Sequence, residues 1–535
     1  MKIVLSALLR RRAVSILALS LALWYLAVNE LGAETRELPF VESVPCGLPG
    51  KPVENVECGY LYTHLDRGDP GTGTIKIPYQ FIPSRSRDRQ PATIVIITGG
   101  PGGMGLFDPS YAELFEDYHR VRYNAWLEKH DVLRVSQRGL PDTDPALLCE
   151  AFDDHVRSAK IRFQPLTHYL PPPDGEEFGP EYWIVHERLE ARLEKIRSCV
   201  DELDANGVDY RWYNSAAIAD DFSDVINALG LDHVVLWGQS YGTRIALLLI
   251  DRHPEVATAA ILEGAFPPGI GTLEASATKT NGVRSRADRF LDNLGEFDEF
   301  CQKSSSCGET SPNLPEQAIE NYQRLRRTPL ELDISPVSMT GHRMARLDHM
   351  LYAEIIEDAM GNDRNPSILA GIMQGDELWI GFQIAWKRQS EQFVHQPTRL
   401  AVRCLDMGPD TGPPATVHSA PDNPFAEYFD NQPGLDTLCD AWWGGDPPSL
   451  ARAYPVSTDI PVIMLTGEWD TASPPFLMRE QLKYLRHGWA FELKGMGHGV
   501  LHDTCAHQLV RSFLRDIWAP PDSRCVDHGP MPPKN

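Results

Sequence analysis

The 535-residue sequence lacks the signatures of several large protein classes. It has no Cys-x-x-Cys pair and no His-Glu-x-x-His, so the usual zinc sites have no support, and we predict neither a metal nor a cofactor. Its basic residues form no run beyond Arg10-Arg11-Arg12, and the formal net charge is −24. Because an acidic protein repels phosphate, nucleic acid is not an expected partner. No internal repeat or extended low-complexity tract is present.

Residues 1–33 have the pattern of a targeting segment. The three arginines precede an almost wholly apolar stretch, residues 13–28, of about the length of a signal-peptide core. Ala33 offers a small residue for cleavage, although Leu31 fits the small-residue pattern poorly. We favour a secretory signal, with an uncleaved N-terminal anchor as the alternative. The expected location is therefore secreted or periplasmic, with membrane contact only through this segment, because no later stretch is long and apolar enough to span a bilayer.

The ten cysteines agree with export, because an even number in an exported chain permits a complete set of disulfides. Sequence spacing cannot prove the connectivity, and some thiols could be free and buried. Local spacing favours the pairs Cys46–Cys58, Cys149–Cys199, Cys301–Cys307, Cys404–Cys439 and Cys505–Cys525.

Short apolar runs alternate with helical patterns along much of the chain. The apolar spacing over 215–229 predicts an amphipathic helix that Asn214 or Ser215 can cap and that Gly230 ends. Other helices are expected around 182–200 and over 507–518. This alternation predicts a mostly parallel sheet with helices on both faces. The predicted strands are 74–83, 93–98, 131–136, 234–237, 257–262, 461–466 and 489–493.

After Pro267 the pattern becomes helical, irregular and rich in proline until about Tyr454. We therefore expect one sheet domain in two parts, residues 34–266 and 456–535. A mainly helical insertion, residues 267–455, is expected to form a cap over the carboxyl edge of the sheet.

The segment Gly238-Gln239-Ser240-Tyr241-Gly242 carries the strongest chemical signal. It joins an apolar strand to an apolar helix, and glycines on both sides permit a very tight turn at Ser240. A helix that starts at this turn aims its N–H groups at any oxyanion formed on the serine. The pattern predicts Ser240 as the nucleophile of a serine hydrolase.

A serine nucleophile needs a base, and the base needs a carboxylate that holds its tautomer. Asp470 follows one predicted strand, and His498 follows the next one, in the order serine, acid, histidine. Either residue alone could be an ordinary loop residue. Glu468 is a rival acid and His502 a rival base, and the spacing of the two histidines also resembles a helical metal pair. Together, Ser240, Asp470 and His498 predict a catalytic triad.

The glycine cluster after the strand 93–98 is a candidate for the oxyanion-binding loop. We predict that the backbone N–H groups of Gly100 and Tyr241 bind the oxyanion, because Pro101 has no N–H. The alternative is a simple tight loop. A phosphate-binding loop is disfavoured because no Gly-Lys-Ser/Thr follows the cluster.

These motifs resemble the prolyl aminopeptidase and tripeptidyl aminopeptidase family of α/β-hydrolases, and most closely its secreted tripeptidyl-aminopeptidase-like branch. The resemblance covers roughly residues 45–525 and rests on Gly-Gly-Pro-Gly-Gly, Gln-Arg-Gly, Gly-Gln-Ser-Tyr-Gly, Gly-x-x-Asp and Gly-x-Gly-His. It implies an α/β-hydrolase fold with an inserted cap, and it assigns the same triad and oxyanion roles as above. Two positions depart from the family pattern: Ser136 replaces an Asp, and Thr98 replaces a His.

The resemblance implies removal of residues from peptide N-termini, so a carboxylate should bind the substrate ammonium. The candidates are Glu263 and Asp406, with Glu354 and Glu357 as further options, although each could be an ordinary surface carboxylate. The rings of Trp442 and Trp443 could line a pocket for proline or an apolar side chain, or could pack in the core.

The sequence thus predicts an exported serine exopeptidase that acts on the free N-termini of short peptides. Two alternatives stay open. The same triad would serve an esterase, lipase-like enzyme or amidase acting on small molecules, and a hydrolase scaffold could also serve as a secreted, non-catalytic binding protein.

Overall fold

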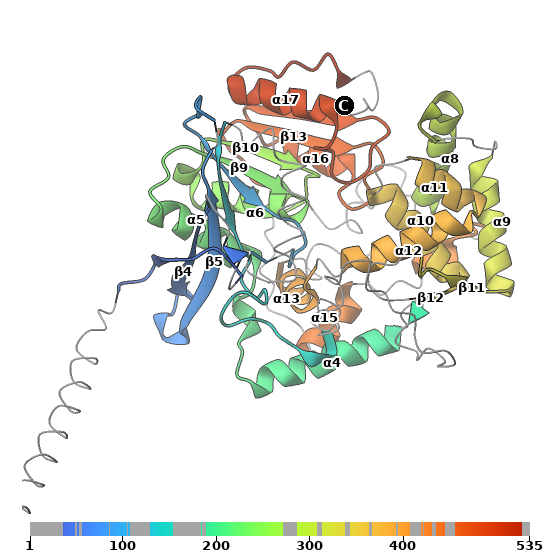
Figure 1. Ribbon diagram of the computed structural model, residues 1–535, viewed down its shortest axis with the longest axis horizontal. Helices are drawn as coiled ribbons and strands as arrows, with labels where there is room; N and C mark the ends of the chain where they lie inside the picture. Colours follow the sequence, from blue (N-terminus) through green and yellow to red (C-terminus); the bar gives the residue numbers. More distant parts are fainter. Residues whose placement is uncertain are drawn as a thin grey trace, which may run out of the picture.

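A nine-stranded sheet forms the centre of the protein, shown in Figure 1 as a computed structural model. The strands at one end of the sheet, from β1 to β7, pair antiparallel, whereas those from β7 to β14 run parallel. In spatial order they are β1 (Phe40–Val44), β4 (Glu57–His64), β5 (Thr74–Ile82), β7 (Asp131–Val135), β6 (Thr93–Ile97), β9 (Val234–Gln239), β10 (Ala259–Glu263), β13 (Val462–Gly467) and β14 (Gly488–Leu493).

The structure describes part of the chain, and the predicted leader lies outside that part. The described residues are 36–48, 51–52, 56–84, 86–103, 105–106, 129–152, 183–184, 189–270, 286–307, 313–337, 343–362, 366–391, 394–406, 419–420, 422–430, 435–444 and 455–526. Within these ranges, no helix combines the length and apolar character needed to cross a membrane.

The central strands are buried on both faces. Every residue of β6, β7, β10 and β13 is buried, as expected for parallel strands that are covered by other elements on each side. Leu236 of β9 packs into the cluster on one face of the sheet, and the next residue, Trp237, packs into the cluster on the other face. The predicted mostly parallel sheet is confirmed.

Helices cover both faces of the sheet. On one face lie α5 (Ser215–Ala228), α6 (Tyr241–Arg252) and α16 (Pro475–Leu482), and on the other lies α17 (Thr504–Arg515). Asn214 caps α5 as predicted, since its side chain accepts a hydrogen bond from the Ala217 N–H at 2.9 Å. The last helix begins three residues earlier than the predicted 507 because Asp503 caps it, accepting from the Cys505 N–H at 2.7 Å.

The helix predicted around 182–200 is displaced toward the C-terminus. It is observed as α4 (Leu189–Ala205), whose buried positions continue to Leu203. Trp183–Ile184 instead forms a short strand, β8, that pairs with β12 of the insertion. A segment that we assigned to the sheet domain therefore hydrogen-bonds to the cap.

The described part of the insertion is mainly helical but also contains strands. Strands β11 (Leu330–Asp333) and β12 (Met344–Leu347) pair antiparallel, which the sequence pattern did not predict. Two strands near the N-terminus, β2 (Gly47–Leu48) and β3 (Lys51–Pro52), form a separate small pair. The helices of the insertion are α8 (Arg286–Lys303), α9 (Leu314–Arg327), α10 (His349–Asn362), α11 (Pro366–Gln374), α12 (Glu377–Glu391), α13 (Gln396–Asp406), α14 (Ala426–Asp430) and α15 (Leu435–Trp443).

The insertion divides between two hydrophobic cores. Helices α8 to α12 and α14 share a core of their own and stand to one side of the sheet (Figure 1). Helices α13 and α15 instead contribute to the main core on the α5–α6 face of the sheet. Helices α13 and α15 are thus packed as part of the sheet domain.

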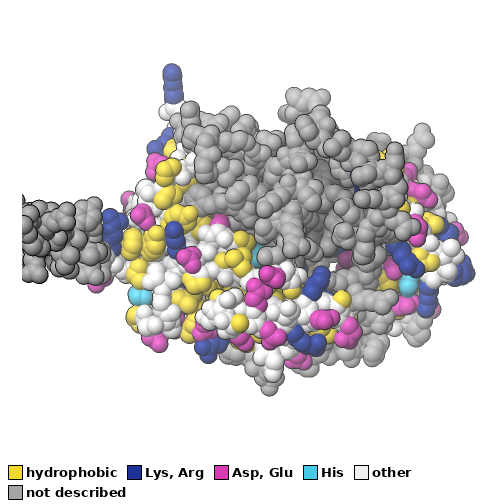
Figure 2. Space-filling model, turned by 60° about the horizontal axis from the view of Figure 1, so that its bottom comes forward, with side chains coloured by type: hydrophobic (Ala, Val, Ile, Leu, Met, Phe, Trp, Pro, Cys, Tyr) yellow, Lys and Arg dark blue, Asp and Glu magenta, His cyan; other side chains and the backbone are white. Residues whose placement is uncertain are grey.

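All five predicted disulfides are confirmed. Cys404–Cys439 joins α13 to α15, and Cys505–Cys525 fastens the C-terminal tail to α17. On the face shown in Figure 2, acidic and basic side chains of the described residues are interspersed, so the negative net charge is not gathered there into one patch.

Candidate active site

Ser240 occupies a strained turn between β9 and α6. Its backbone angles are φ 52° and ψ −123°, a conformation that residues other than glycine rarely adopt. The turn needs the flanking glycines, because a Cβ added at Gly238 would lie 2.7 Å from the Cα of Thr243, and one added at Gly242 would collide with the Ile97 carbonyl. The Ser240 side chain makes no capping hydrogen bond to α6, so the helix start does not engage its hydroxyl.

The structure brings Asp470 and His498 together from the ends of β13 and β14. Their Oδ2 and Nδ1 atoms are 2.8 Å apart. Asp470 is 3% exposed, and its Oδ1 accepts hydrogen bonds from the N–H groups of Ala472 at 2.9 Å and Ser473 at 2.7 Å. A carboxylate held in this way fixes a proton on Nδ1 of the imidazole and leaves Nε2 able to act as a base.

Ser473 is a functional residue that the sequence analysis missed. Its hydroxyl donates to Asp470 Oδ2 at 2.7 Å and lies 3.1 Å from His498 Nδ1. The only sequence signal is its place three residues after Asp470, where serine side chains often bond back to a nearby carboxylate in turns.

The rival acid Glu468 has other partners. It forms an ion pair with Lys494 at 2.7 Å and accepts from the Gly495 N–H at 3.0 Å, which ties together the loops after β13 and β14. Among the residues that the structure describes, no group of three His, Cys, Asp or Glu side chains is arranged to hold a metal ion.

The end of β10 lies between the serine turn and the histidine loop. The Glu263 carbonyl accepts from the Ser240 N–H at 2.7 Å. The next residue, Gly264, has φ 64°, and a Cβ added there would lie 2.9 Å from Cε1 of His498. Ser240 and His498 therefore approach the same end of β10.

Glu263 does not occupy a position suited to binding a substrate ammonium. Its side chain is 2% exposed and contacts the segments that carry Ser240 and His498: Oε2 accepts from Gln239 Nε2 at 3.0 Å, and Oε1 accepts from the Leu501 N–H at 2.8 Å. The carboxylate links the residue before Ser240 to the loop that carries His498. This geometry argues against the predicted substrate contact and assigns Glu263 a positioning role.

The glycine-rich loop after β6 passes directly over the serine. A Cβ added at Gly99 would lie 3.0 Å from the Ser240 Cβ and 3.6 Å from its Oγ. Gly100 has φ 124°, which requires glycine, and the Gly102 N–H is engaged by Gln137 at 2.9 Å. The two predicted oxyanion donors thus lie in this loop, at Gly100, and directly after Ser240, at Tyr241, the first residue of α6.

Asp406 is also buried instead of facing a substrate. It lies at the end of α13, is 3% exposed, and its Oδ2 accepts from the Ser215 N–H at the start of α5 at 2.7 Å. The Ser215 hydroxyl in turn lies 2.7 Å from the hydroxyl of Tyr241. Burial raises the pKa of Asp406, although Arg244 and the bonds from Ser215 oppose this shift.

This raised pKa predicts a pH-dependent stability difference for Asp406→Asn. The folded-state pKa lies above the unfolded value of about 3.9, so the native state loses stability as pH rises through the folded pKa. Asn cannot ionise and escapes that loss. Urea unfolding between pH 4 and pH 8 should therefore show the variant gaining stability relative to wild type as pH rises. A stability difference between variant and wild type that is constant from pH 4 to pH 8 would contradict the prediction.

Trp442 packs in the core. Its side chain is fully buried on α15, and its ring lies 5.4 Å from that of Tyr210 in an edge-on contact. The ring of Trp443 lies 5.0 Å from the same tyrosine. Of the two readings for these tryptophans, the structure favours core packing over a substrate pocket.

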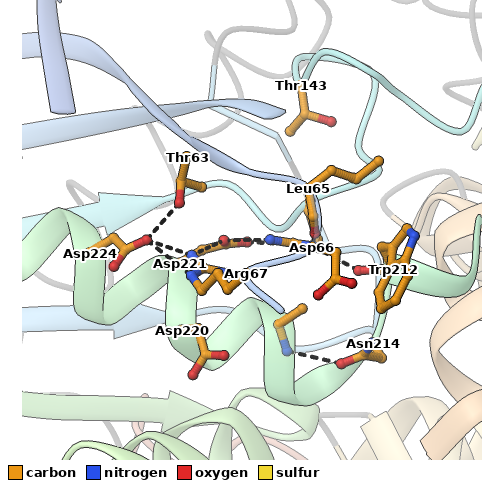
Figure 3. Close-up of polar contacts among 12 residues, drawn as sticks. Thr63, Leu65, Asp66, Arg67, Thr143, Trp212, Asn214, Asp220, Asp221 and Asp224 are labelled. Atoms are coloured by element: carbon orange, nitrogen blue, oxygen red, sulfur yellow. Dashed lines mark hydrogen bonds and ion pairs between the residues drawn. The ribbon is translucent and has the colours of Figure 1, made fainter. Parts of the chain in front are cut away.

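The Gln-Arg-Gly motif after β7 is anchored by a buried ion pair. Arg138 is fully buried, and its Nε and Nη2 donate to the two carboxylate oxygens of Asp221 on α5 at 2.8 and 2.7 Å. Asp221 also accepts from Arg67, which bonds Asp224 one turn further along α5 (Figure 3). The end of β7 is thus fixed to α5.

The position before this motif has a carboxylate beside it, despite the departure from the family pattern. The Ser136 hydroxyl donates to Asp142 Oδ2 at 2.7 Å, and the Leu106 N–H donates to the same oxygen at 2.6 Å. Asp142 thereby places a carboxylate next to residue 136, where the family pattern has an Asp.

Comparison with protein families agrees with this architecture. Residues 92–297 match the family described as alpha/beta hydrolase fold, and residues 425–525 match the one described as TAP-like protein. The protein is an α/β-hydrolase. The TAP-like match at its C-terminal part and its similarity to a serine protease support a tripeptidyl- and prolyl-aminopeptidase-like hydrolase, as its motifs indicated.

Several known proteins are similar to this chain. Serine protease Hip1 from Mycobacterium tuberculosis (strain ATCC 25618 / H37Rv) is 23% identical over 506 residues, which cover 90% of each chain. Among solved structures, proline iminopeptidase from Mycobacterium smegmatis is 13% identical with a TM-score of 0.36, covering 85% of this chain and 98% of that one. A thermophilic esterase from Thermogutta terrifontis is 13% identical with a TM-score of 0.31, covering 84% and 96%.

Proposed function

We propose that this hydrolase is an exported serine exopeptidase that releases residues or short peptides from the free N-termini of peptides. The observation that carries the proposal is the 2.8 Å contact between Asp470 Oδ2 and His498 Nδ1. This His498 and the strained Ser240 approach the same end of β10. The match to a TAP-like family and the similarity to a serine protease support a peptide as the substrate.

The proposed reaction passes through an acyl-enzyme. His498 removes the proton from the Ser240 hydroxyl as its oxygen attacks the peptide carbonyl, and Asp470 stabilises the imidazolium that forms. The N–H groups of Gly100 and Tyr241 bind the oxyanion of the tetrahedral intermediate. His498 then protonates the leaving amine, and water attacks the acyl-enzyme by the same route in reverse. No step requires a metal or a cofactor.

Helix α10 of the cap has an acidic face, and this face begins next to the loop that carries His498. Glu354, Glu357 and Gly361 of α10 are spaced at one helical turn and therefore share a face. At Gly361, the helix carbonyl accepts the backbone N–H of His498. Because Glu357 lies only one turn from that contact, we assign it the substrate ammonium, although its Oε2 also accepts from the Tyr428 hydroxyl at 3.0 Å. Glu354 lies a further turn away and pairs with Lys387 at 3.2 Å.

A comparison of free and blocked substrates tests the proposal. Peptide arylamides with a free N-terminus should be cleaved about 10- to 100-fold faster than their N-acetylated forms, because acetylation removes a charge-assisted hydrogen bond. Mass spectrometry of the products then gives the number of residues released per cut. Fast ester turnover without cleavage of unblocked peptides would instead support the small-molecule esterase.

A variant in the cap separates recognition from chemistry. Glu357→Gln should reduce the preference for free N-termini while acetylated substrates keep their rate. Glu354→Gln is the matched control, and it should leave the preference unchanged. An equal loss on both substrates in Glu357→Gln would refute the ammonium assignment without touching the triad.

The same proposal includes export. The arginine-led apolar segment at the N-terminus and the five disulfides support an oxidising compartment, either outside the cell or periplasmic. Contact with a membrane is proposed only through an uncleaved leader.

A further inference from the structure

The side chain of Gln137 holds the glycine-rich loop from its inner side. Gln137 follows β7 and is 1% exposed. Its Nε2 donates to the Thr98 carbonyl at 2.9 Å and to the Gly99 carbonyl at 3.3 Å, and its Oε1 accepts from the Gly102 N–H at 2.9 Å. One amide therefore satisfies both arms of the turn that contains Gly100.

The opposite side of the loop is held by the cap. The Gly102 carbonyl accepts from the His395 N–H at 2.8 Å, and Gly103 forms an isolated antiparallel bridge with Val394. A Cβ added at Gly102 would collide with this segment, lying 2.6 Å from the His395 carbonyl. The loop is thus enclosed between the amide of Gln137 and the backbone that leads into α13.

The position of Gln137 is itself fixed. The next residue, Arg138, is locked to Asp221, and its Nη1 also donates to the carbonyls of Leu65 and Trp212, each at 2.8 Å. In Figure 3 the carbonyl-bearing residues Leu65 and Trp212 lie around the same buried cluster as Asp221. The arginine therefore anchors the strand end from which the glutamine reaches the loop.

We propose that Gln137 is a positioning residue for the oxyanion hole, acting through the shape of the 99–102 loop, and that Arg138 fixes the strand end that presents it. This inference rests on the proposed serine chemistry. Gln137 bonds the Gly102 N–H and the carbonyls of Thr98 and Gly99, on either side of Gly100, whose N–H is the proposed oxyanion donor. A preplaced N–H stabilises the transition state more than the bound substrate, so its misplacement should lower kcat much more than it changes KM.

The test compares Gln137→Met with Gln481→Met. The first change removes all three bonds to the loop with little change of volume. Gln481 is a buried glutamine that bonds the Val456 carbonyl at 2.6 Å and has no contact with the site, so it is a matched control. With active sites titrated by a p-nitrophenyl ester burst, Gln137→Met should lose about 10- to 100-fold in kcat, since direct loss of an oxyanion donor costs about 10²–10³. KM should change less than about threefold.

The inhibition constant of a boronic acid provides a second measurement. It should not change if Gln137 only stabilises the fold. The Ser240 oxygen forms a B–O bond to the trigonal boron as its proton passes to His498, and the anionic tetrahedral boronate places one of its oxygens in the oxyanion hole. The inhibition constant in Gln137→Met should rise in proportion to the fall in kcat. Gln481→Met should leave both values unchanged.

A second variant covers the case in which Gln137→Met does not fold. Gln137→Glu keeps an acceptor for the Gly102 N–H but, when ionised, loses both donors, so its kcat should also fall. The proposal is overturned if either folded variant keeps kcat within about threefold of wild type, or loses kcat while boronate binding is unchanged. If the wild-type protein does not react with esters, peptides or a fluorophosphonate, the proposed function is wrong. If the wild type is active and both variants keep that activity, only the role assigned to Gln137 is wrong.

Discussion

Replacing Ser240 by alanine should reduce turnover by about 10⁴-fold or more and abolish labelling by a fluorophosphonate probe. The reason is that the acyl-enzyme route needs the Ser240 hydroxyl oxygen, and the neighbouring hydroxyl of Tyr241 is engaged 2.7 Å from the Ser215 hydroxyl. Loss of a single triad member in comparable hydrolases removes nearly all of the benefit of the triad, because its members act as a unit. The measurement is initial rate on an unblocked peptide arylamide, together with gel detection of the probe.

The control for this prediction is Ser223→Ala. Ser223 is a buried serine on α5 whose Oγ accepts from Asn227 Nδ2 at 3.3 Å. It has no part in the proposed reaction. It should retain both activity and labelling. Persistent labelling of Ser240→Ala at another serine would overturn the assignment of the nucleophile.

Replacing Asp221 by alanine should lower the free energy of unfolding by about 3–5 kcal/mol. The substitution leaves the guanidinium of Arg138, which is fully buried, without its carboxylate partner. It also removes one of the two carboxylates that bind Arg67. Urea unfolding followed by tryptophan fluorescence measures the loss.

Asp224→Ala is the matched control for this ion pair. Asp224 binds the same Arg67 and accepts from the buried Thr63 hydroxyl at 2.8 Å, but the side chains of Asp224 and Arg67 are partly exposed, at 20% and 26%, so water can reach the place of the lost carboxylate. Its removal should cost about 1 kcal/mol or less. If the two variants lose the same free energy of unfolding, the burial of Arg138 does not determine how much the loss of its carboxylate partner destabilises the protein.

Local patterns in the sequence predicted much of the framework. The strands of the sheet centre are short β-branched or apolar runs bounded by glycine, and the five disulfides join cysteines whose spacing is local or moderate. Because the carboxyl ends of parallel strands meet at one edge, placing Asp470 and His498 after successive strands was enough to expect their contact.

Roles that depend on distant packing were not predictable in this way. Asp406 meets Ser215 across 191 residues of sequence, and Glu263 meets Leu501 across 238. The local sequence around a carboxylate near the end of a strand or helix does not indicate whether a backbone N–H or a substrate will bind it. The strands β8 and β12 also pair across a long separation in sequence. For this reason the sequence pattern predicted a mainly helical cap and did not reveal its strands.

The bond between Gly361 and the His498 backbone has a consequence for how substrate gains access. It joins the end of cap helix α10 to the residue that must take the serine proton. Any swing of α10 that widens the mouth of the site must either break this bond or drag the imidazole with it. If the bond persists while the helix moves, the imidazole moves away from the Ser240 hydroxyl with it; if the bond breaks, Asp470 still holds the imidazole. The position of this cap helix and the position of the base are therefore coupled only while the bond between Gly361 and His498 is intact.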